Sequence, residues 1–128
     1  MTGINYLLDT CFMIELYNGN PEVLSIIQNK QIELPQCGIS PINRMEVLGF
    51  NALPADDETN LNNLLDSLVS FPINRQIENK AIDLRKNHKI KLPDCIVLAT
   101  ALTHGLELLT LDTGLKNKYV AELAGVNR

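Results

Sequence analysis

Short apolar runs alternate with amphipathic segments along this chain, and two of the runs stop abruptly at an acidic residue. Ile4 to Leu8 ends at Asp9, and Leu106 to Leu111 ends at Asp112. Apolar runs of this length are typical of buried strands, whereas apolar residues spaced three or four positions apart are typical of helices. Strands that alternate with helices favour βαβ units with right-handed crossovers and a parallel sheet. The sequence therefore predicts the α/β class.

Helix-capping residues, two of them followed by proline, mark the starts of three further helices. Asn20-Pro21, Ser40-Pro41 and Asn74 each precede a segment with helical apolar spacing. The helix that starts after Ser40 carries Glu46. We expect two more strands, over Cys37 to Ser40 and over Val69 to Ile73.

Two boundaries are predicted from single residues. We expect a loop over Asn51 to Thr59, whose three consecutive acids lie near the positive end of the helix that follows. Asp94 is predicted to cap a helix over Cys95 to Leu102, which Gly105 closes.

The length of 128 residues corresponds to one domain, so we expect a single domain over residues 1–128. No apolar run approaches the ~20 residues of a membrane span. No basic residue precedes Lys30, which argues against a signal peptide. We therefore expect a soluble cytoplasmic protein without a membrane partner. The three cysteines contain no C-x-x-C pair and are expected to be buried, free thiols.

Four acidic residues are predicted to meet at one edge of the sheet: Asp9, Glu46, Asp94 and Asp112. In an open parallel sheet, residues that follow the strands converge on one crevice, even when they are 103 positions apart as Asp9 and Asp112 are. Carboxylates brought together repel one another unless a cation neutralises them. Oxygen-only ligands favour Mg²⁺ or Mn²⁺ over zinc.

Each of these acids also has a purely structural interpretation. Asp9 and Asp94 are good helix caps, and Asp112 before Thr113-Gly114 suits the start of a turn. Glu46 fits a solvent-facing position on an amphipathic helix. Spacing alone leaves both interpretations open.

The charges are distributed unevenly, which changes what the net charge implies. A net charge of −4 argues against a protein that grips duplex DNA with a broad basic face. However, residues 1–64 hold two basic and eight acidic side chains, and residues 65–128 hold nine and seven. The second half contains what we call the basic cluster, which consists of Arg85, Lys86, His88, Lys89 and Lys91. Divalent cations bound to the four acids would neutralise their negative charge, and the basic cluster could then bind phosphate.

Four stretches carry these acids in order along the chain: Leu7 to Ile14, Ser40 to Gly49, Asp94 to Ala101 and Leu109 to Asp112. Together they resemble the motifs of the PIN-domain family, and within it the VapC-type toxins of bacterial toxin–antitoxin modules. The resemblance implies a three-layer α/β/α sandwich with a central parallel sheet. It also implies an endoribonuclease that requires Mg²⁺ or Mn²⁺ and cleaves selected cellular RNA.

Carried over by position, the resemblance implies that Asp9, Glu46, Asp94 and Asp112 are the catalytic, metal-binding residues. Asp9 and Asp94 would be central ligands, Asp112 a ligand of a second or shared metal, and Glu46 a ligand or a base that orients water. Thr110 matches a hydroxyl position near the acids, although a threonine in a strand needs no function. The family often has a further acid shortly after the position of Asp112, and here residues 113–116 contain none.

RNA contacts are expected from the basic cluster, through Arg85, Lys86, Lys89 and Lys91, and from Arg44. A solvated helix end that complements the helix dipole explains the cluster equally well. His88 is expected to be exposed with the rest of the cluster. Arg44 is alternatively a surface charge or a contact for an antitoxin.

The same resemblance implies two kinds of partner, which are a cognate antitoxin protein and a second copy of the chain in a homodimer. The missing acid after Asp112 leaves open a catalytically silent PIN-like domain that only binds RNA or protein. The sequence does not fit a phosphoacceptor receiver domain, because it has no pair of acids after the first strand. It does not fit a dinucleotide-binding domain either, because it has no glycine-rich motif.

Overall fold

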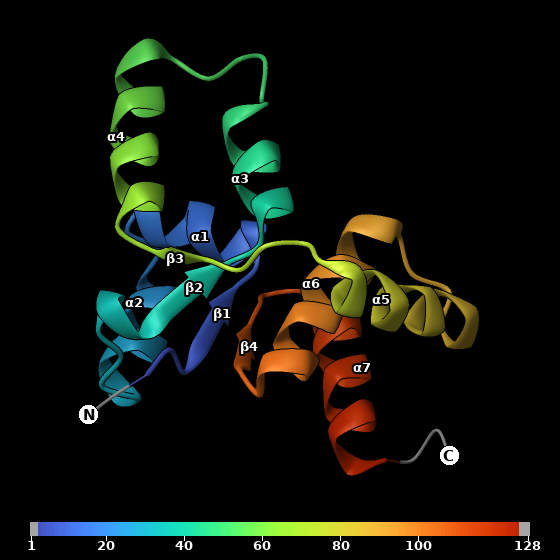
Figure 1. Cartoon of the computed structure of the whole chain (residues 1–128). Coiled ribbons are helices and arrows are strands. Elements are labelled where there is room, and N and C mark those ends of the chain that lie inside the picture. The colour runs from blue at the N-terminus through green and yellow to red at the C-terminus, as the bar shows by residue number, and fades with distance from the viewer. Residues whose placement is uncertain (1–2, 126–128) are drawn as a thin grey trace.

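A four-stranded parallel sheet forms the centre of the computed structural model, which describes residues 3–125 (Figure 1). Its strands are β1 (Tyr6–Leu8), β2 (Cys37–Ile39), β3 (Val69–Ser70) and β4 (Glu107–Leu109). They lie in the order β3-β2-β1-β4. The first strand of the chain therefore occupies the middle of the sheet, where Tyr6 lies opposite both Cys37 of β2 and Glu107 of β4.

Helices cover both faces of the sheet (Figure 1). Successive strand residues point to opposite faces, so Leu7 and Leu108 join one buried cluster while Leu8 and Leu109 join the other. The helices of the first face are α5 (Arg75–Asn87), α6 (Leu92–His104) and α7 (Thr113–Ala124). Those of the second face are α1 (Thr10–Tyr17), α2 (Pro21–Asn29), α3 (Pro41–Leu48) and α4 (Ala55–Asp66), with a short 3-10 helix, η1 (Leu34–Gln36), before β2. The expected α/β/α sandwich is confirmed.

The predicted helix caps are confirmed at all three positions. Asn20 Oδ1 accepts from the backbone N–H of Glu22 at 2.8 Å, and Asn74 Oδ1 accepts from that of Ile77 at 2.9 Å. Ser40 caps α3 in the same way. These residues satisfy backbone donors that the first helical turn leaves without partners.

The predicted loop over Asn51 to Thr59 is too long. α4 already begins at Ala55, after Pro54 in an extended conformation, so Asp56, Asp57 and Glu58 lie inside its first turn. Negative charge is stabilising at the positive end of a helix. The acids therefore extend α4 toward its N-terminus and do not lie in the predicted loop before it.

The third strand is shorter than the predicted Val69 to Ile73, since β3 contains only Val69–Ser70. Pro72 has no N–H to donate to a sheet ladder. Beside this strand, the backbone of Gly38 approaches the ring of Phe71 so closely that a Cβ atom would clash. Any larger residue at position 38 would force the Phe71 ring to move.

Helix α6 is the most buried helix of the fold and ends where predicted. Gly105 closes it with φ of 65°, a left-handed conformation that glycine adopts readily. Cys95 on this helix and Cys37 in β2 are buried, free thiols, as expected. Within residues 3–125, no helix has the length and apolar character needed to cross a membrane.

Candidate functional site

The carboxyl ends of β1 and β4 lie side by side, and an acidic residue follows each of them. The backbone N–H of Asp9 donates to the carbonyl of Leu109 at 3.0 Å, which continues the pairing of the two strands. Asp112 follows three residues after Leu109. The sheet therefore brings Asp9 and Asp112 to one edge, as its predicted topology implies.

Hydrogen bonds hold both carboxylate oxygens of Asp9, which is only 7% exposed. Oδ1 accepts from the backbone N–H of Thr10 at 2.9 Å, so Asp9 caps α1. Oδ2 accepts from Thr110 Oγ1 at 2.8 Å and from Cys11 Sγ at 3.6 Å. Burial raises the pKa of the Cys11 thiol, which keeps its proton available for donation. Asp9 is thus both a cap and an oriented carboxylate.

Thr110 connects Asp9 to Asp112. Its hydroxyl donates to Asp9 and accepts from the backbone N–H of Asp112 at 3.1 Å. Asp112 Oδ1 in turn accepts from the backbone N–H of Leu115 at 3.1 Å. Asp112 therefore caps helix α7, where the sequence suggested a simple turn, and Thr110 lies beside the acids as its position suggested.

Asp94 lies in the first turn of α6 and not at the predicted N-cap. The helix begins at Leu92, and Lys91, in an extended conformation, occupies the cap position. The reason is Pro93, whose fixed φ and missing N–H suit a first helical turn. The predicted helix starts at Cys95, three residues after the observed start at Leu92, so Asp94 lies inside the helix and is not its cap.

The carboxyl group of Asp94 is destabilised in its charged form. Burial raises the pKa of Asp94, and the negative charges of Asp9, Asp112 and Glu46 raise it further. The positive charge of Lys91 acts in the opposite direction and lowers this pKa. Asp9, Asp112 and Glu46 are therefore near enough for their negative charges to act on the carboxyl group of Asp94.

Glu46 reaches the same site from α3. Its side chain is exposed, as the structural interpretation of this residue expects. It is nevertheless oriented, because Thr10 Oγ1 donates to Glu46 Oε1 at 2.6 Å. Thr10 is the residue directly after Asp9, so this bond joins the start of α1 to the last turn of α3.

The four acids line a single open cavity of about 490 Å³. Its lining residues are Asp9, Thr10, Cys11, Ile14, Glu46, Asp94, Leu111 and Asp112. Within the described range 3–125, no three His, Cys, Asp or Glu side chains are placed to hold a metal ion as they stand. The carboxylates of Asp9, Glu46 and Asp112 instead accept hydrogen bonds from neighbouring protein groups.

The basic cluster borders a second hollow of about 360 Å³, lined by Arg85, His88, Lys89, Ile90 and Lys91. Arg85 Nη1 donates to the carbonyl of Ile90 at 3.4 Å. Lys86 and Lys89 are exposed. Since Lys91 directly precedes α6, the cluster lies next to the helix that carries Asp94.

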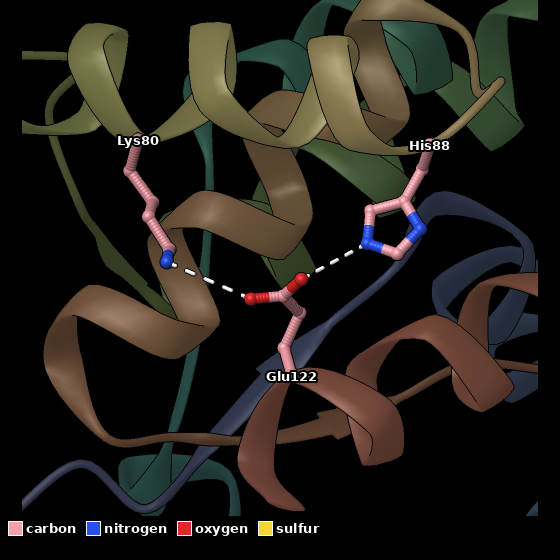
Figure 2. Close-up of polar contacts among 3 residues, drawn as sticks. All are labelled: Lys80, His88 and Glu122. Atoms are coloured by element: carbon pink, nitrogen blue, oxygen red, sulfur yellow. Dashed lines mark hydrogen bonds and ion pairs between the residues drawn. The ribbon is translucent and has the colours of Figure 1, made fainter. Parts of the chain in front are cut away.

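His88 is not an exposed member of the cluster, contrary to the prediction. Its side chain is 11% exposed, and Nε2 lies 2.9 Å from Glu122 Oε2 of α7 (Figure 2). Lys80 Nζ lies 3.7 Å from the other oxygen of Glu122. His88 directly follows α5, so this contact attaches the end of α5 to α7. The two residues, His88 and Glu122, are 34 positions apart in the chain.

Three other residues differ from, or add to, what the sequence indicated. Arg44 donates to Asn62 Oδ1 of α4 at 3.3 Å and does not line the acidic cavity. Cys11 is half-buried beside Asp9 and not part of the core. Asn43, for which no role is predicted from the sequence, is fully buried and donates to Thr10. Its signal is an asparagine three positions after the cap Ser40, where a capping box has a polar side chain.

Comparisons with known proteins agree with this architecture. A family model described as PIN domain matches residues 6–121. No curated protein matches the sequence significantly. A chain in a toxin–antitoxin complex from Klebsiella pneumoniae is 35% identical with a TM-score of 0.73, and the alignment covers 85% of this chain and 88% of that one.

Two further solved structures show the same fold at lower identity. FitAcB from Neisseria gonorrhoeae has a TM-score of 0.74 at 22% identity, with 89% of this chain and 92% of that chain covered. VapBC2 from Rickettsia felis, bound to a promoter DNA fragment, has a TM-score of 0.66 at 20% identity, with 84% and 86% covered. These matches confirm the resemblance drawn from the four acidic stretches. Because the family model spans all four strands and all four acids, this chain belongs to the PIN-domain family.

Proposed function

We propose that this protein is an endoribonuclease toxin that requires Mg²⁺ or Mn²⁺ and hydrolyses phosphodiester bonds of selected cellular RNA. The observation that carries the proposal is the convergence of four carboxylates, from four separate elements, on one open cavity. Membership in a family of nucleases supports it.

The donor set fits a hard divalent cation. Asp9, Glu46, Asp94 and Asp112 offer oxygen ligands alone, which Mg²⁺ and Mn²⁺ prefer. Burial raises the pKa of Asp94, and the charges of the three other carboxylates raise it further, a repulsion that a cation would relieve. When bound by these carboxylates, a divalent cation would supply a water of lowered pKa for the attack and would stabilise charge on the leaving 3′ oxygen. We assign Asp9 and Asp94 as central ligands, Asp112 as a ligand of a second or shared metal, and Glu46 as a ligand or water-orienting base.

The basic cluster is proposed to bind the RNA backbone beside this site. Arg85, Lys86, Lys89 and Lys91 supply positive charge at the end of α5 and before α6. Arg44 on α3 is a further candidate contact for phosphate or for an antitoxin. The chain has three Phe, three Tyr and no Trp, so recognition would depend on shape and phosphate more than on stacking.

A protein partner is proposed from the same comparisons. The 35% identity to a chain of a toxin–antitoxin complex supports an antitoxin as the regulator of this protein. We propose that residues 1–128 form a single cytoplasmic nuclease domain that works as a homodimer. Residues 1–2 and 126–128 of that domain lie outside the described part of the chain.

Cleavage of RNA by the purified protein tests the proposal. Activity should require Mg²⁺ or Mn²⁺ and stop when EDTA is added. Asp9→Asn and Asp94→Asn should each lose activity by about 100-fold or more, since each removes a charged ligand of the reacting centre. Asp66→Asn is the matched control, because it removes the same charge from an exposed position at the end of α4.

Two results would contradict the proposal. If Asp9→Asn and Asp94→Asn cut RNA as fast as the parent, the site is assigned wrongly. If the parent cuts no RNA and calorimetry detects no divalent-ion binding at millimolar concentration, a catalytically silent PIN-like domain that binds RNA or protein is the better description.

A further inference from the structure

Asn43 is a fully buried polar residue that contacts neither solvent nor the acidic cavity. Its Oδ1 accepts from the backbone N–H of Ser40 at 2.9 Å, and its Nδ2 donates to Thr10 Oγ1 at 3.0 Å. A backbone N–H can only donate, so the amide oxygen must face Ser40. The amide nitrogen, which can also only donate, must then face Thr10. The orientation of the Asn43 amide is therefore determined by its surroundings.

The orientation of Asn43 determines that of the Thr10 hydroxyl. Because Thr10 Oγ1 accepts from Asn43, its own proton is free to point elsewhere. Thr10 Oγ1 lies 2.6 Å from Glu46 Oε1, and a carboxylate oxygen can only accept. The hydrogen bonds thus run in one direction, from the Ser40 backbone through Asn43 and Thr10 to Glu46.

We propose that Asn43 is a positioning residue of the acidic site, which fixes the carboxylate of Glu46 through the Thr10 hydroxyl. The inference rests on the proposed function in taking Glu46 as part of the working site. Glu46 is exposed, and a free glutamate side chain of this kind samples many rotamers. Groups that orient the residues touching a metal or substrate commonly affect metal affinity or activity by 10–100-fold.

The two roles of Asn43 can be separated. As the third residue of α3 it completes a capping box with Ser40, which is a structural role. In Asn43→Asp, one carboxylate oxygen can still accept from Ser40, but the donor to Thr10 is gone. The Thr10 proton is then drawn to residue 43 and away from Glu46. The variant keeps the size and the cap and removes the positioning.

Three further variants complete the design. Asn43→Asp adds a negative charge, so the neutral Thr10→Val is the second test, and it also covers the case in which Asn43→Asp does not fold. Thr10→Ser keeps the hydroxyl and should rescue the effect. Asn74→Ala is the control for stability, because it removes an asparagine cap from α5, away from the acidic cavity.

The experiment combines two measurements. NMR side-chain couplings of Glu46 in the metal-free protein report whether its carboxylate keeps one rotamer. RNA cleavage with Mg²⁺ or Mn²⁺ then gives kcat and KM. Asn43→Asp and Thr10→Val should average the Glu46 rotamers and lower kcat by on the order of tenfold, with KM changed less than about twofold. Thr10→Ser and Asn74→Ala should resemble the parent in both measurements.

The outcomes distinguish this inference from the proposed function. If the parent cuts RNA and Asn43→Asp and Thr10→Val retain both its kcat and its ordered Glu46, the positioning role is wrong and the nuclease remains. If the parent cuts no RNA but Glu46 loses its single rotamer in these variants, the positioning role holds and the nuclease proposal fails. A loss of kcat in Asn74→Ala equal to that in Asn43→Asp would show that the effect is only one of stability.

Discussion

The carboxyl group of Asp94 is harder to ionise in the folded protein than in water. Burial and three neighbouring carboxylates raise its pKa above the ordinary value of 3.8. Ionising Asp94 therefore costs more in the folded protein than in the unfolded chain. This cost is absent below about pH 4, where the group is protonated in both states. It grows as the pH rises toward the folded pKa and is complete above it.

Asp94→Asn should for this reason stabilise the metal-free protein at pH 7. The gain in free energy of unfolding should be at most about 1 kcal/mol, because water screens a partly exposed carboxylate. The gain should vanish below about pH 4. Denaturant unfolding at both pH values measures it, with Asp66→Asn as the control. Added Mg²⁺ should stabilise the parent and not Asp94→Asn, since only the parent keeps the site intact. A variant less stable than the parent at pH 7 would contradict this account.

The acids themselves could be found from the sequence, but the hydrogen bonds among them could not. Asp9 and Asp112 follow apolar runs, and parallel topology brings such positions together. The chain from Asn43 through Thr10 to Glu46 depends on side-chain distances between α1 and α3. No local pattern specifies those distances.

At the scale of elements, three helix starts that have a side-chain cap were predicted well, whereas the starts of α4 and α6, which have none, were not. The caps Asn20, Ser40 and Asn74 bond to backbone groups within three residues, so the sequence contains the whole interaction. The start of α6 depends instead on Pro93, which also suits the second position of a helix. His88 was predicted from its basic neighbours, although its partner lies on another helix.

The contact between His88 and Glu122 attaches the end of α5 to α7. Glu122 has a side chain only 5% exposed and lies between His88 and Lys80 (Figure 2). A buried carboxylate that loses its charge weakens both of these interactions at once. The packing of α5 on α7 therefore depends in part on one acidic side chain.

Glu122→Gln should lower the free energy of unfolding by about 1–3 kcal/mol. Glu78→Gln is the matched control on α5, since Glu78 pairs with Arg75 at 3.5 Å and its side chain is 53% exposed. That substitution should change stability by less than about 0.5 kcal/mol. Thermal or denaturant unfolding measures both. Equal losses in the two variants would mean that Glu122 does not connect the helices as described.

At the scale of the whole molecule, the acidic cavity and the basic cluster divide the charge between two regions. The cluster borders its own hollow directly before the helix that carries Asp94. An RNA strand bound along the cluster would therefore reach the carboxylates. The net charge of −4 hides this arrangement, since it averages the two regions.

Removing two charges from the cluster should weaken RNA binding without changing the chemistry. In Lys86→Ala combined with Lys89→Ala, KM should rise several-fold while kcat stays near that of the parent. The slope of log affinity against log salt should fall by roughly one to one and a half. Arg75→Ala combined with Lys118→Ala removes the same charge elsewhere and should change neither quantity. If both pairs weaken binding equally, only overall charge matters and the cluster is not a binding site.

The central place of β1 has a consequence for how the protein comes into being. β1 is synthesised before the other three strands, but Tyr6 can pair with Glu107 only after about a hundred more residues have been added. Sequence-distant pairings of this kind form late, because a long loop must close first. During synthesis the chain presents Asp9 and Glu46 early, but the cavity gains Asp112 only when β4 and α7 have left the ribosome. Whatever reaction the cavity performs, a growing chain is unable to perform it before Asp112 and α7 have been synthesised.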